Sequence, residues 1–128
     1  MLVGYSGGGT LAVLTAPRLQ GVQAVVTVAA NLDIHAWTAH HGYLPLTQSL
    51  NPTDMAERTP WPQIHLRGDH DEVVPEATLT RYFATHPFDV EWRYPRNDHV
   101  CCWREQWPEI VERLRREFPQ SFATTASP

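Results

Sequence analysis

The first thirty residues alternate between apolar runs and glycine-rich or polar breaks. Residues 2–5 form a short apolar stretch, and residues 10–16 are apolar on nearly all sides and end before Pro17. Such a run, stopped by a proline, is typical of a helix that is buried on most sides. Residues 24–30 are β-branched and small without polar alternation, which is typical of a central parallel strand covered on both faces. The pattern therefore predicts a strand, a sharp turn, a helix and a buried strand.

Two further strands are predicted in the second half of the chain. Residues 63–68 form a short apolar stretch that runs into an acidic loop. Residues 89–94 alternate strictly, with Val90, Trp92 and Tyr94 on one side, as in a half-exposed edge strand.

Prolines predict where two later helices begin. Pro75 and Pro108 each suit a first-turn position, where the missing N–H costs no hydrogen bond. Strands separated by helices in this order predict an α/β fold with a mostly parallel sheet. The apolar faces of the two helices are predicted to be Leu79, Tyr82 and Phe83 in the first, and Ile110, Val111, Leu114 and Phe118 in the second.

Residues 31–60 have no sustained hydrophobic period and are rich in proline. We expect an irregular segment with short helices near residues 33–39 and 52–58. Its length exceeds that of an ordinary connection, which favours a lid or a pocket wall. The 128 residues suffice for one domain. We place that domain at residues 1–119, followed by a disordered tail at 120–128.

Composition and charge exclude several classes of protein. The chain is 42% hydrophobic and 19% charged, as in globular proteins. All ten basic residues are arginines and the net charge is -4, so we expect no nucleic-acid partner. No apolar run approaches the roughly 20 residues of a membrane span. No signal peptide is recognisable either, which makes the cytoplasm the default while any preceding targeting segment is left open.

The cysteines and several histidines suggest no metal or cofactor. Cys101 and Cys102 are adjacent, far from the usual Cα separation of about 5.5 Å in a disulfide, so we expect two free thiols that pack beside His99. His35, His40 and His41 lie in the irregular segment without a cysteine or a well-placed carboxylate, and we expect no metal there. A metal site formed by these three histidines is the alternative interpretation.

Residues 4–8, Gly-Tyr-Ser-Gly-Gly, match the pattern G-x-S-x-G between an apolar strand and an apolar helix. A serine on such a turn has strained dihedrals and an exposed Oγ, and glycines beside it avoid collisions with the strand and helix. The N–H of Gly7 would lie at the helix N-terminus, where negative charge is stabilised. The alternatives are a structural glycine turn and a phosphate cradle. A G-x-x-x-x-G-K-[ST] loop is excluded because the chain has no lysine.

A serine nucleophile needs a base, and the base needs an acid that orients it. Asp69 and Asp71 directly follow the third predicted strand, and His99 follows the fourth. In a parallel sheet the carboxyl ends of the strands lie along one edge, so we expect Ser6, the acidic loop and His99 to converge there.

From residue 1 to about residue 118 the chain resembles the C-terminal half of an α/β-hydrolase. Three features carry this resemblance: the G-x-S-x-G turn, a histidine after the last strand, and a loop that matches the family's G-x-x-D-x-x-V-P at Gly68, Asp71, Val74 and Pro75. The resemblance implies a serine hydrolase for an ester or related acyl bond of a small molecule.

The resemblance also assigns roles to individual residues. It implies Ser6 as the nucleophile, Asp71 as the orienting acid, His99 as the general base and the Gly7 N–H as an oxyanion donor. Asp69 is the rival for the acid, whereas Asp98 is expected to cap a loop. His70 is expected to be a loop side chain without a role. Trp37, Tyr43 and Leu44 either line an acyl pocket or pack the irregular segment onto the sheet.

The family's strand order, 1-2-4-3-5-6-7-8, implies a partial fold. The chain would supply strands five to eight, a mostly parallel half-sheet flanked by helices. Its first strand would then have a free edge, which favours self-association. The family's second oxyanion donor follows strand three, which is absent here, and Met1 begins inside the nucleophile strand. The alternative is therefore a truncated, catalytically weak or inactive fragment that needs the missing N-terminal half.

Overall fold

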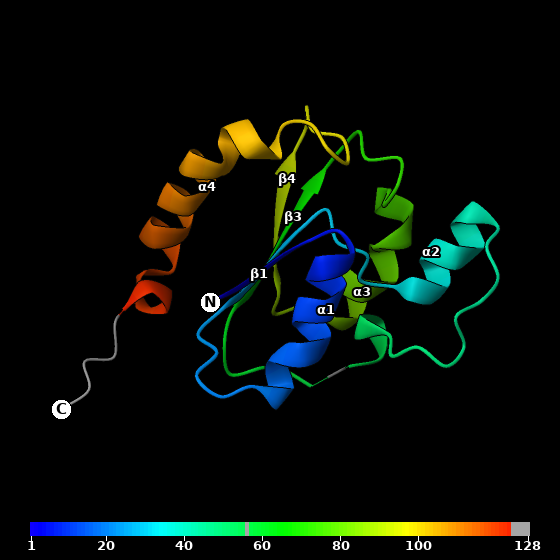
Figure 1. Ribbon diagram of the computed structural model, residues 1–128, viewed down its shortest axis with the longest axis horizontal. Coiled ribbons are helices and arrows are strands. Elements are labelled where there is room, and N and C mark those ends of the chain that lie inside the picture. Colours follow the sequence, from blue (N-terminus) through cyan, green and yellow to red (C-terminus); the bar gives the residue numbers. More distant parts are fainter. Residues whose placement is uncertain (56, 124–128) are drawn as a thin grey trace.

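The computed structural model describes residues 1–55 and 57–123 and contains a four-stranded sheet (Figure 1). The strands are β1 (Leu2–Tyr5), β2 (Val25–Val28), β3 (Gln63–Gly68) and β4 (Val90–Tyr94), all parallel and in this order. This arrangement confirms the predicted parallel half-sheet, with β2 central and β4 at an edge. The register pairs the last residues of neighbouring strands, Tyr5 with Val28 and Gly68 with Tyr94, so the carboxyl ends share one edge of the sheet.

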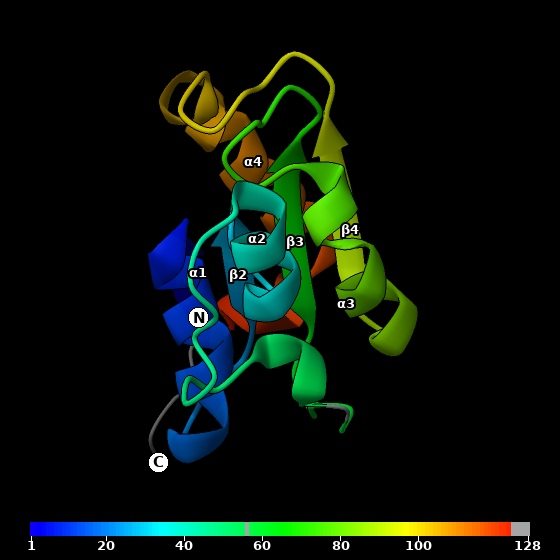
Figure 2. The same ribbon diagram turned by 90° about the vertical axis from the view of Figure 1, so that its right-hand side faces the viewer.

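Helices cover both faces of the sheet (Figures 1 and 2). On one face lie α1 (Gly7–Thr15), α2 (Ile34–His41) and α3 (Thr80–Thr85), and on the other lies α4 (Trp103–Glu117). Short 3-10 helices complete the described chain: η1 (Ala16–Arg18), η2 (Pro52–Asp54), η3 (Glu76–Thr78) and η4 (Pro119–Phe122). In residues 1–55 and 57–123, no helix has the length and apolar character needed to cross a bilayer.

The sheet separates two apolar cores. Val26 and Val28 face α4 and pack with its Ile110 and Leu114. Val25 faces the opposite core, which contains residues of α1, η1, α3 and the loop after β2. Side chains on both faces of β2 are therefore buried, and this explains why its sequence is continuously apolar.

Helix α1 is less buried than its sequence predicts. Val13 and Ala16 face the core, but Leu11 is 64% exposed and Leu14 is only half-buried. The expectation of a helix covered on most sides is therefore wrong for the side of α1 that carries Leu11 and Leu14. The apolar residues there face a cavity, described below, rather than another element of secondary structure.

The last helix begins five residues earlier than predicted, at Trp103 rather than Pro108. Pro108 lies inside α4, where it removes one backbone donor. Packing explains the difference, because Trp103 is buried and contacts the ring of Tyr94 at the end of β4. Tertiary contacts therefore override the start signal of the proline.

The tail prediction is wrong for residues 120–123. Pro119–Phe122 form η4, the hydroxyl of Ser121 donates to the carbonyl oxygen of Gln23 at 3.1 Å, and Phe122 packs against the α4 core. The rest of the predicted tail, residues 124–128, lies outside the described residues.

The described part of the segment 31–60, which omits residue 56, contains two short elements, close to those predicted. Helix α2 is capped by the side chain of Asp33, which accepts a hydrogen bond from the N–H of Ala36 at 3.2 Å. Where the second helix was predicted, at 52–58, the described residues form η2 at Pro52–Asp54, and residue 56 lies outside the described residues. Asn51 joins the two elements, because its amide accepts from the N–H of Ile34 and donates to Asp33. A lid role for this segment stays a prediction.

Candidate active site

Ser6 lies in a strained turn between β1 and α1. Its φ of 53° and ψ of -125° are unfavourable for a residue with a side chain. Its N–H donates to the carbonyl oxygen of Val28 at 2.8 Å, which ties the turn to the end of β2. A Cβ on Gly4 would collide with the backbone of Gly8, so the turn requires a glycine at position 4. Gly8 itself has open space where a Cβ would lie.

The second tightly packed glycine is Gly9, one position beyond the motif. A Cβ there would lie 2.6 Å from the Cβ of Ala30 and 3.0 Å from that of Thr27. Gly9 therefore lets α1 approach β2 closely. The expectation that both glycines beside Ser6 avoid collisions holds for Gly4, whereas in the helix the tight contact is at Gly9.

A chain of hydrogen bonds joins Ser6, His99 and Asp71. Ser6 Oγ lies 3.0 Å from His99 Nε2, and His99 Nδ1 lies 2.9 Å from Asp71 Oδ2. These side chains come from the ends of β1, β4 and β3, which the parallel register brings to one edge of the sheet. The structure thus brings together the three predicted residues, at distances that permit proton transfer from the hydroxyl.

Asp71 is buried and held by its own loop. Its Oδ1 accepts hydrogen bonds from the N–H groups of Val73 and Val74, at 2.9 and 2.8 Å. The other carboxylate oxygen is left for His99. The side chain of Asp71 is 1% exposed and that of His99 is 16% exposed, so the pair lies largely out of water while the imidazole stays accessible. This arrangement orients the ring toward Ser6.

Backbone contacts hold the two loops together. The N–H of His70 donates to the carbonyl oxygen of Asn97 at 3.0 Å. A Cβ on Gly68 would collide with the backbone of Asn97, so only a glycine permits this approach. Asn97 is completely buried, and its side-chain amide forms two reciprocal hydrogen bonds with that of Gln106 in α4. Helix α4 therefore anchors the loop that carries His99.

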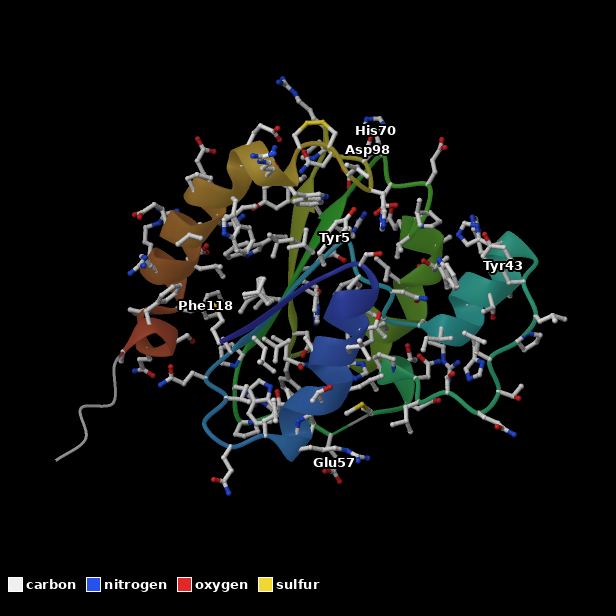
Figure 3. All side chains as sticks on the ribbon, viewed as in Figure 1. Tyr5, Tyr43, Glu57, His70, Asp98 and Phe118 are labelled. Atoms are coloured by element: carbon white, nitrogen blue, oxygen red, sulfur yellow. A yellow bond between two sulfur atoms is a disulfide. The ribbon has the colours of Figure 1, made fainter. Side chains whose placement is uncertain are left out.

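Tyr5 is a site residue that sequence reasoning missed. Its hydroxyl donates to the carbonyl oxygen of His99 at 2.7 Å, and the two ring centroids are 5.5 Å apart. Burial, followed by the negative charges of Asp71 and Asp98, raises the pKa of Tyr5 above its usual range. Figure 3 shows Tyr5 in the same half of the molecule as His70 and Asp98, and Glu57 at the opposite end. Tyr5 occupies the first variable position of G-x-S-x-G, and the motif does not predict this contact.

The N–H of Gly7 is the first of helix α1 and makes no backbone hydrogen bond within residues 1–55 and 57–123. It adjoins Ser6, and Gly7 itself is exposed. A free N–H at a helix N-terminus stabilises negative charge nearby. The local geometry therefore suits the predicted oxyanion donor.

Comparisons with known proteins bear on the fold. No protein-family model and no curated protein sequence matches the chain. Solved structures do match. The esterase domain of a Rhodothermus marinus protein superposes with a TM-score of 0.69 at 20% identity, over 91% of this chain and 59% of that domain. An esterase from Pyrococcus furiosus gives 0.69 at 13% identity, over 91% and 53%.

A third match carries the family name. The alpha/beta hydrolase MGS-MChE2, from a metagenome of lagoon sediments at Mar Chica in Morocco, gives a TM-score of 0.64 at 19% identity, over 93% of this chain and 60% of that enzyme. This chain has a partial α/β-hydrolase fold. It spans 53 to 60% of the length of these three matched structures. At this identity the likeness establishes the fold alone.

Within this α/β-hydrolase fold the rival acids are engaged elsewhere. Asp69 accepts hydrogen bonds from Arg67 and, through both oxygens, from Arg93. The hydrogen bond from Arg93 lowers the pKa of Asp69, and the two positive charges act in the same direction. Asp98 accepts from the N–H groups of Val100 and Cys101, which lowers its pKa and caps the loop beside His99.

The two cysteines of this α/β-hydrolase fold differ from the prediction of free thiols. Cys101 and Cys102 are joined by a disulfide bond, and the peptide bond between them is cis. The expectation of two free thiols, which rested on the short Cα separation of neighbouring residues, is therefore wrong. Cys101 is exposed and Cys102 half-buried, so neither is a buried packing residue.

The histidines of α2 serve as contacts for aromatic rings and backbone. His41 Nε2 lies 2.7 Å from the carbonyl oxygen of Val73, and its ring stacks on that of Tyr43. His40 packs edge-on against His41. Among the residues that the structure describes, no group of three or more His, Cys, Asp or Glu side chains is arranged to hold a metal ion.

A cavity of about 560 Å³ adjoins Ser6 and is walled partly by α2. Trp37 lines this cavity, in agreement with the alternative that places it in a pocket wall. Tyr43 and Leu44 do not line it and are 55% and 87% exposed. Of the two alternatives left open for these residues, a place in the pocket wall fits Trp37 and does not fit Tyr43 or Leu44.

Proposed function

We propose that this chain is a serine hydrolase that cleaves an ester or related acyl bond of a small molecule. The observation that carries the proposal is the continuous hydrogen-bond chain from Ser6 through His99 to Asp71. A hydroxyl in contact with an imidazole, itself oriented by a buried carboxylate, is the arrangement that makes serine nucleophilic. The esterase matches agree with this chemistry but do not carry it, because they establish the fold alone.

In the proposed acylation, Ser6 Oγ attacks the ester carbonyl carbon while His99 Nε2 accepts the hydroxyl proton. Asp71 holds the imidazole in the required tautomer and stabilises the imidazolium that forms. The N–H of Gly7 donates to the negative oxygen of the tetrahedral intermediate. The intermediate collapses, the bond to the leaving oxygen breaks, and His99 Nε2 gives its proton to that oxygen.

Deacylation repeats these steps with water. His99 accepts a proton from a water molecule, whose oxygen attacks the carbonyl carbon of the acyl-Ser6 intermediate. When this second intermediate collapses, the proton returns to Ser6 Oγ and the carboxylic acid leaves. The side chains of Ser6, His99 and Asp71 end the cycle as they began it, so the proposed reaction needs no cofactor.

A second candidate is a reactive site with low turnover, which needs the N-terminal half of the family fold for full activity. Two observations favour it. The chain spans only 59% of the Rhodothermus esterase domain. Within the described residues, the donor assigned to the oxyanion is the single N–H of Gly7. Loss of one oxyanion donor typically lowers kcat by about 10² to 10³-fold.

Labelling with a fluorophosphonate probe tests the proposal, because the probe reacts with activated serine hydroxyls. We expect labelling of the full chain, and its loss in Ser6→Ala and in His99→Ala. Asp71→Asn should lower the labelling rate on the order of 10⁴-fold, as a wrongly oriented imidazole does in other triads. The matched control is Asp69→Asn, which leaves the hydrogen bonds of His99 intact and should change the rate by less than about threefold.

The outcomes separate the candidates. No labelling of a folded sample, verified by circular dichroism, would contradict the proposal. Rapid labelling combined with rapid turnover of p-nitrophenyl esters supports the first candidate. Rapid labelling with turnover that is lower by about 10² to 10³-fold than in efficient esterases supports the second. Loss of labelling in Asp69→Asn, with labelling retained in Asp71→Asn, would transfer the role of the acid to the rival.

A further inference from the structure

The cavity beside Ser6 is large enough for a substrate group. Its volume of about 560 Å³ falls within the range of small-molecule sites, about 300 to 1,000 Å³. Two of its walls are helices: α1, which follows the nucleophile turn, and α2, which follows the loop after β2. They contribute Leu11 and Leu14 from α1 and Ile34 and Trp37 from α2.

The lining of this cavity is mostly apolar, and its polar members, Ser6, Thr10, Asn31 and Ser49, are uncharged. Exposed large apolar side chains gather here: Leu11, Leu50 and Val73 line the cavity with exposed fractions of 64%, 62% and 43%. Among the described residues that line it, none carries a charged side chain. Clustered exposed apolar surface marks a binding site. The absence of charge in the lining favours a neutral ligand over a carboxylate or an amine, because a buried unpaired charge is costly.

The position of His99 identifies the part of the substrate that the cavity receives. In ester cleavage the leaving oxygen must reach Nε2 of His99, which returns the proton. Ser6 and Gly7 line the cavity, but His99 and Tyr5 do not. A substrate bound with its carbonyl at Ser6 therefore directs its leaving group toward His99 and its acyl group into the cavity.

The wall formed by α2 is held in place by the loop that carries the acid. The indole N–H of Trp37 donates to the carbonyl oxygen of Val73 at 2.9 Å, and His41 Nε2 lies 2.7 Å from the same oxygen. Val73 in turn donates its N–H to Asp71. One loop thus positions both the acid and a wall of the cavity, which links the cavity to the reacting centre.

We infer that the cavity binds a neutral, apolar acyl group of medium length, such as octanoyl, in contact with the lining side chains Leu14 and Leu50. This inference rests on the proposed function and narrows its substrate class. Each methylene that is buried in the transition state should raise kcat/KM by up to about fourfold. A longer acyl chain is therefore preferred until the cavity is filled.

The test compares p-nitrophenyl acetate, butyrate and octanoate, which differ only in the acyl group. We expect kcat/KM for octanoate to exceed that for acetate by at least about tenfold. Leu14→Trp and Leu50→Trp fill the cavity, and each should lower this ratio at least about fivefold. Leu50 is exposed, so its variant should fold even if Leu14→Trp does not. The matched control is Leu44→Trp, in the same segment but outside the cavity, which should leave the ratio within about twofold.

Two outcomes would overturn the inference. One is a ratio near unity in a chain that the fluorophosphonate probe labels. The other is an effect of Leu50→Trp on the preference between ethyl acetate and octyl acetate that exceeds its effect on the acyl series. The second result would place the alcohol, rather than the acyl group, in the cavity.

A binding measurement separates failure of the inference from failure of the proposed function. Ser6→Ala should bind octanamide, a neutral analogue of the acyl group, at least about tenfold more tightly than butyramide in calorimetric titrations. Leu50→Trp should remove this preference and Leu44→Trp should retain it. Octanamide binding without probe labelling of the unmodified chain would overturn the hydrolase function alone. Labelling without octanamide binding would overturn the inference alone.

Discussion

The hydroxyl of Tyr5 donates a hydrogen bond of 2.7 Å to the backbone carbonyl oxygen of His99, which lies 94 residues away in the chain. Tyr5 precedes Ser6, so this bond couples the nucleophile turn directly to the loop that carries the imidazole. Because burial and the charges of Asp71 and Asp98 raise the pKa of Tyr5, its hydroxyl remains a donor throughout the neutral and mildly alkaline range.

Tyr5→Phe should therefore lower kcat without a comparable change in KM. The loss of one hydrogen bond, worth about 1 kcal/mol, corresponds to about fivefold in rate if it acts on the position of His99. We expect KM to stay within about twofold and the melting temperature to change little. Steady-state kinetics on p-nitrophenyl butyrate measure both parameters. Tyr43→Phe, at an exposed position just after the C-terminal end of α2, is the control, and an unchanged kcat in folded Tyr5→Phe would refute the positioning role.

Substitution of the glycines at the nucleophile turn should have opposite effects. Gly4→Ala places a Cβ against the backbone of Gly8, and overpacking of this kind costs about 1 to 3 kcal/mol. We expect a lower free energy of unfolding and at least about tenfold slower labelling of Ser6. Gly8→Ala has open space and a helical position, so it should raise stability by about 0.5 to 1 kcal/mol. Urea denaturation measures both, and equal effects would contradict the observed turn.

Asp89 should contribute stability that is lost in acid. Its Oδ2 accepts hydrogen bonds from Tyr82 at 2.6 Å, from His65 at 2.8 Å and from Gln63 at 3.2 Å. Burial raises the pKa of Asp89, but the hydrogen bond and charge of His65 and the hydrogen bond of Tyr82 outweigh it, so the pKa lies below its usual range. A lowered folded-state pKa means that this stabilisation is present above the unfolded pKa, about 3.9, and is lost as the pH falls through the folded value.

Asp89→Asn should lower the free energy of unfolding by about 2 kcal/mol at pH 7, because an amide cannot accept from all three donors. The variant should also lose less stability than the parent between pH 5 and the acid limit. Urea denaturation at a series of pH values provides the measurement. Asp54→Asn is the matched control, since Asp54 and its partner Arg81 are both more than half exposed and such pairs contribute little. Parallel pH profiles for Asp89→Asn and the parent would contradict this account.

The outer edge of β1 is expected to mediate self-association. The N–H of Leu2 donates to the carbonyl oxygen of Ala24, just before β2, and that of Ser6 to Val28 at its end, so the N–H groups of Val3 and Tyr5 face the other edge. No strand pairs with that edge in the described residues, and Val3 is 49% exposed. An unpaired edge of this kind is a template for another strand.

Val3→Pro should therefore weaken association without loss of a hydrogen bond to β2, because proline removes only the N–H of the outer edge. Sedimentation velocity at increasing protein concentration should show dimers or larger species for the parent chain and a larger monomer fraction for Val3→Pro. Val3→Ala keeps the N–H and should associate like the parent. A parent chain that stays monomeric at all concentrations would refute the expectation.

Several features of the fold and the site were predictable because they depend on residues close together in the sequence. The strict alternation at residues 89–94 predicts the half-exposed strand β4, and the continuous apolar run predicts the central strand β2. The turn around Ser6 was predictable for the same reason, since the glycine at position 4 meets a backbone only four residues later.

Other features depend on residues distant in sequence and were not predictable. The start of α4 at Trp103 is set by packing on β4, against the local signal of Pro108. One side of α1 is exposed because it lines the cavity. A helix with an apolar sequence does not itself specify which of its sides will be covered.

The amino-acid sequence by itself determined the residue types, their order and their place at strand ends: Ser6, then an acid after the third strand, then His99. Local hydrophobic periodicity and turn chemistry suffice for that, because parallel strands share one carboxyl edge. The tertiary structure decided that Asp71 rather than Asp69 contacts His99, because arginines of β3 and β4 engage Asp69. It also decided the contact of Tyr5 and the shape of the cavity. These depend on strand register and loop packing between distant segments, which no local pattern specifies.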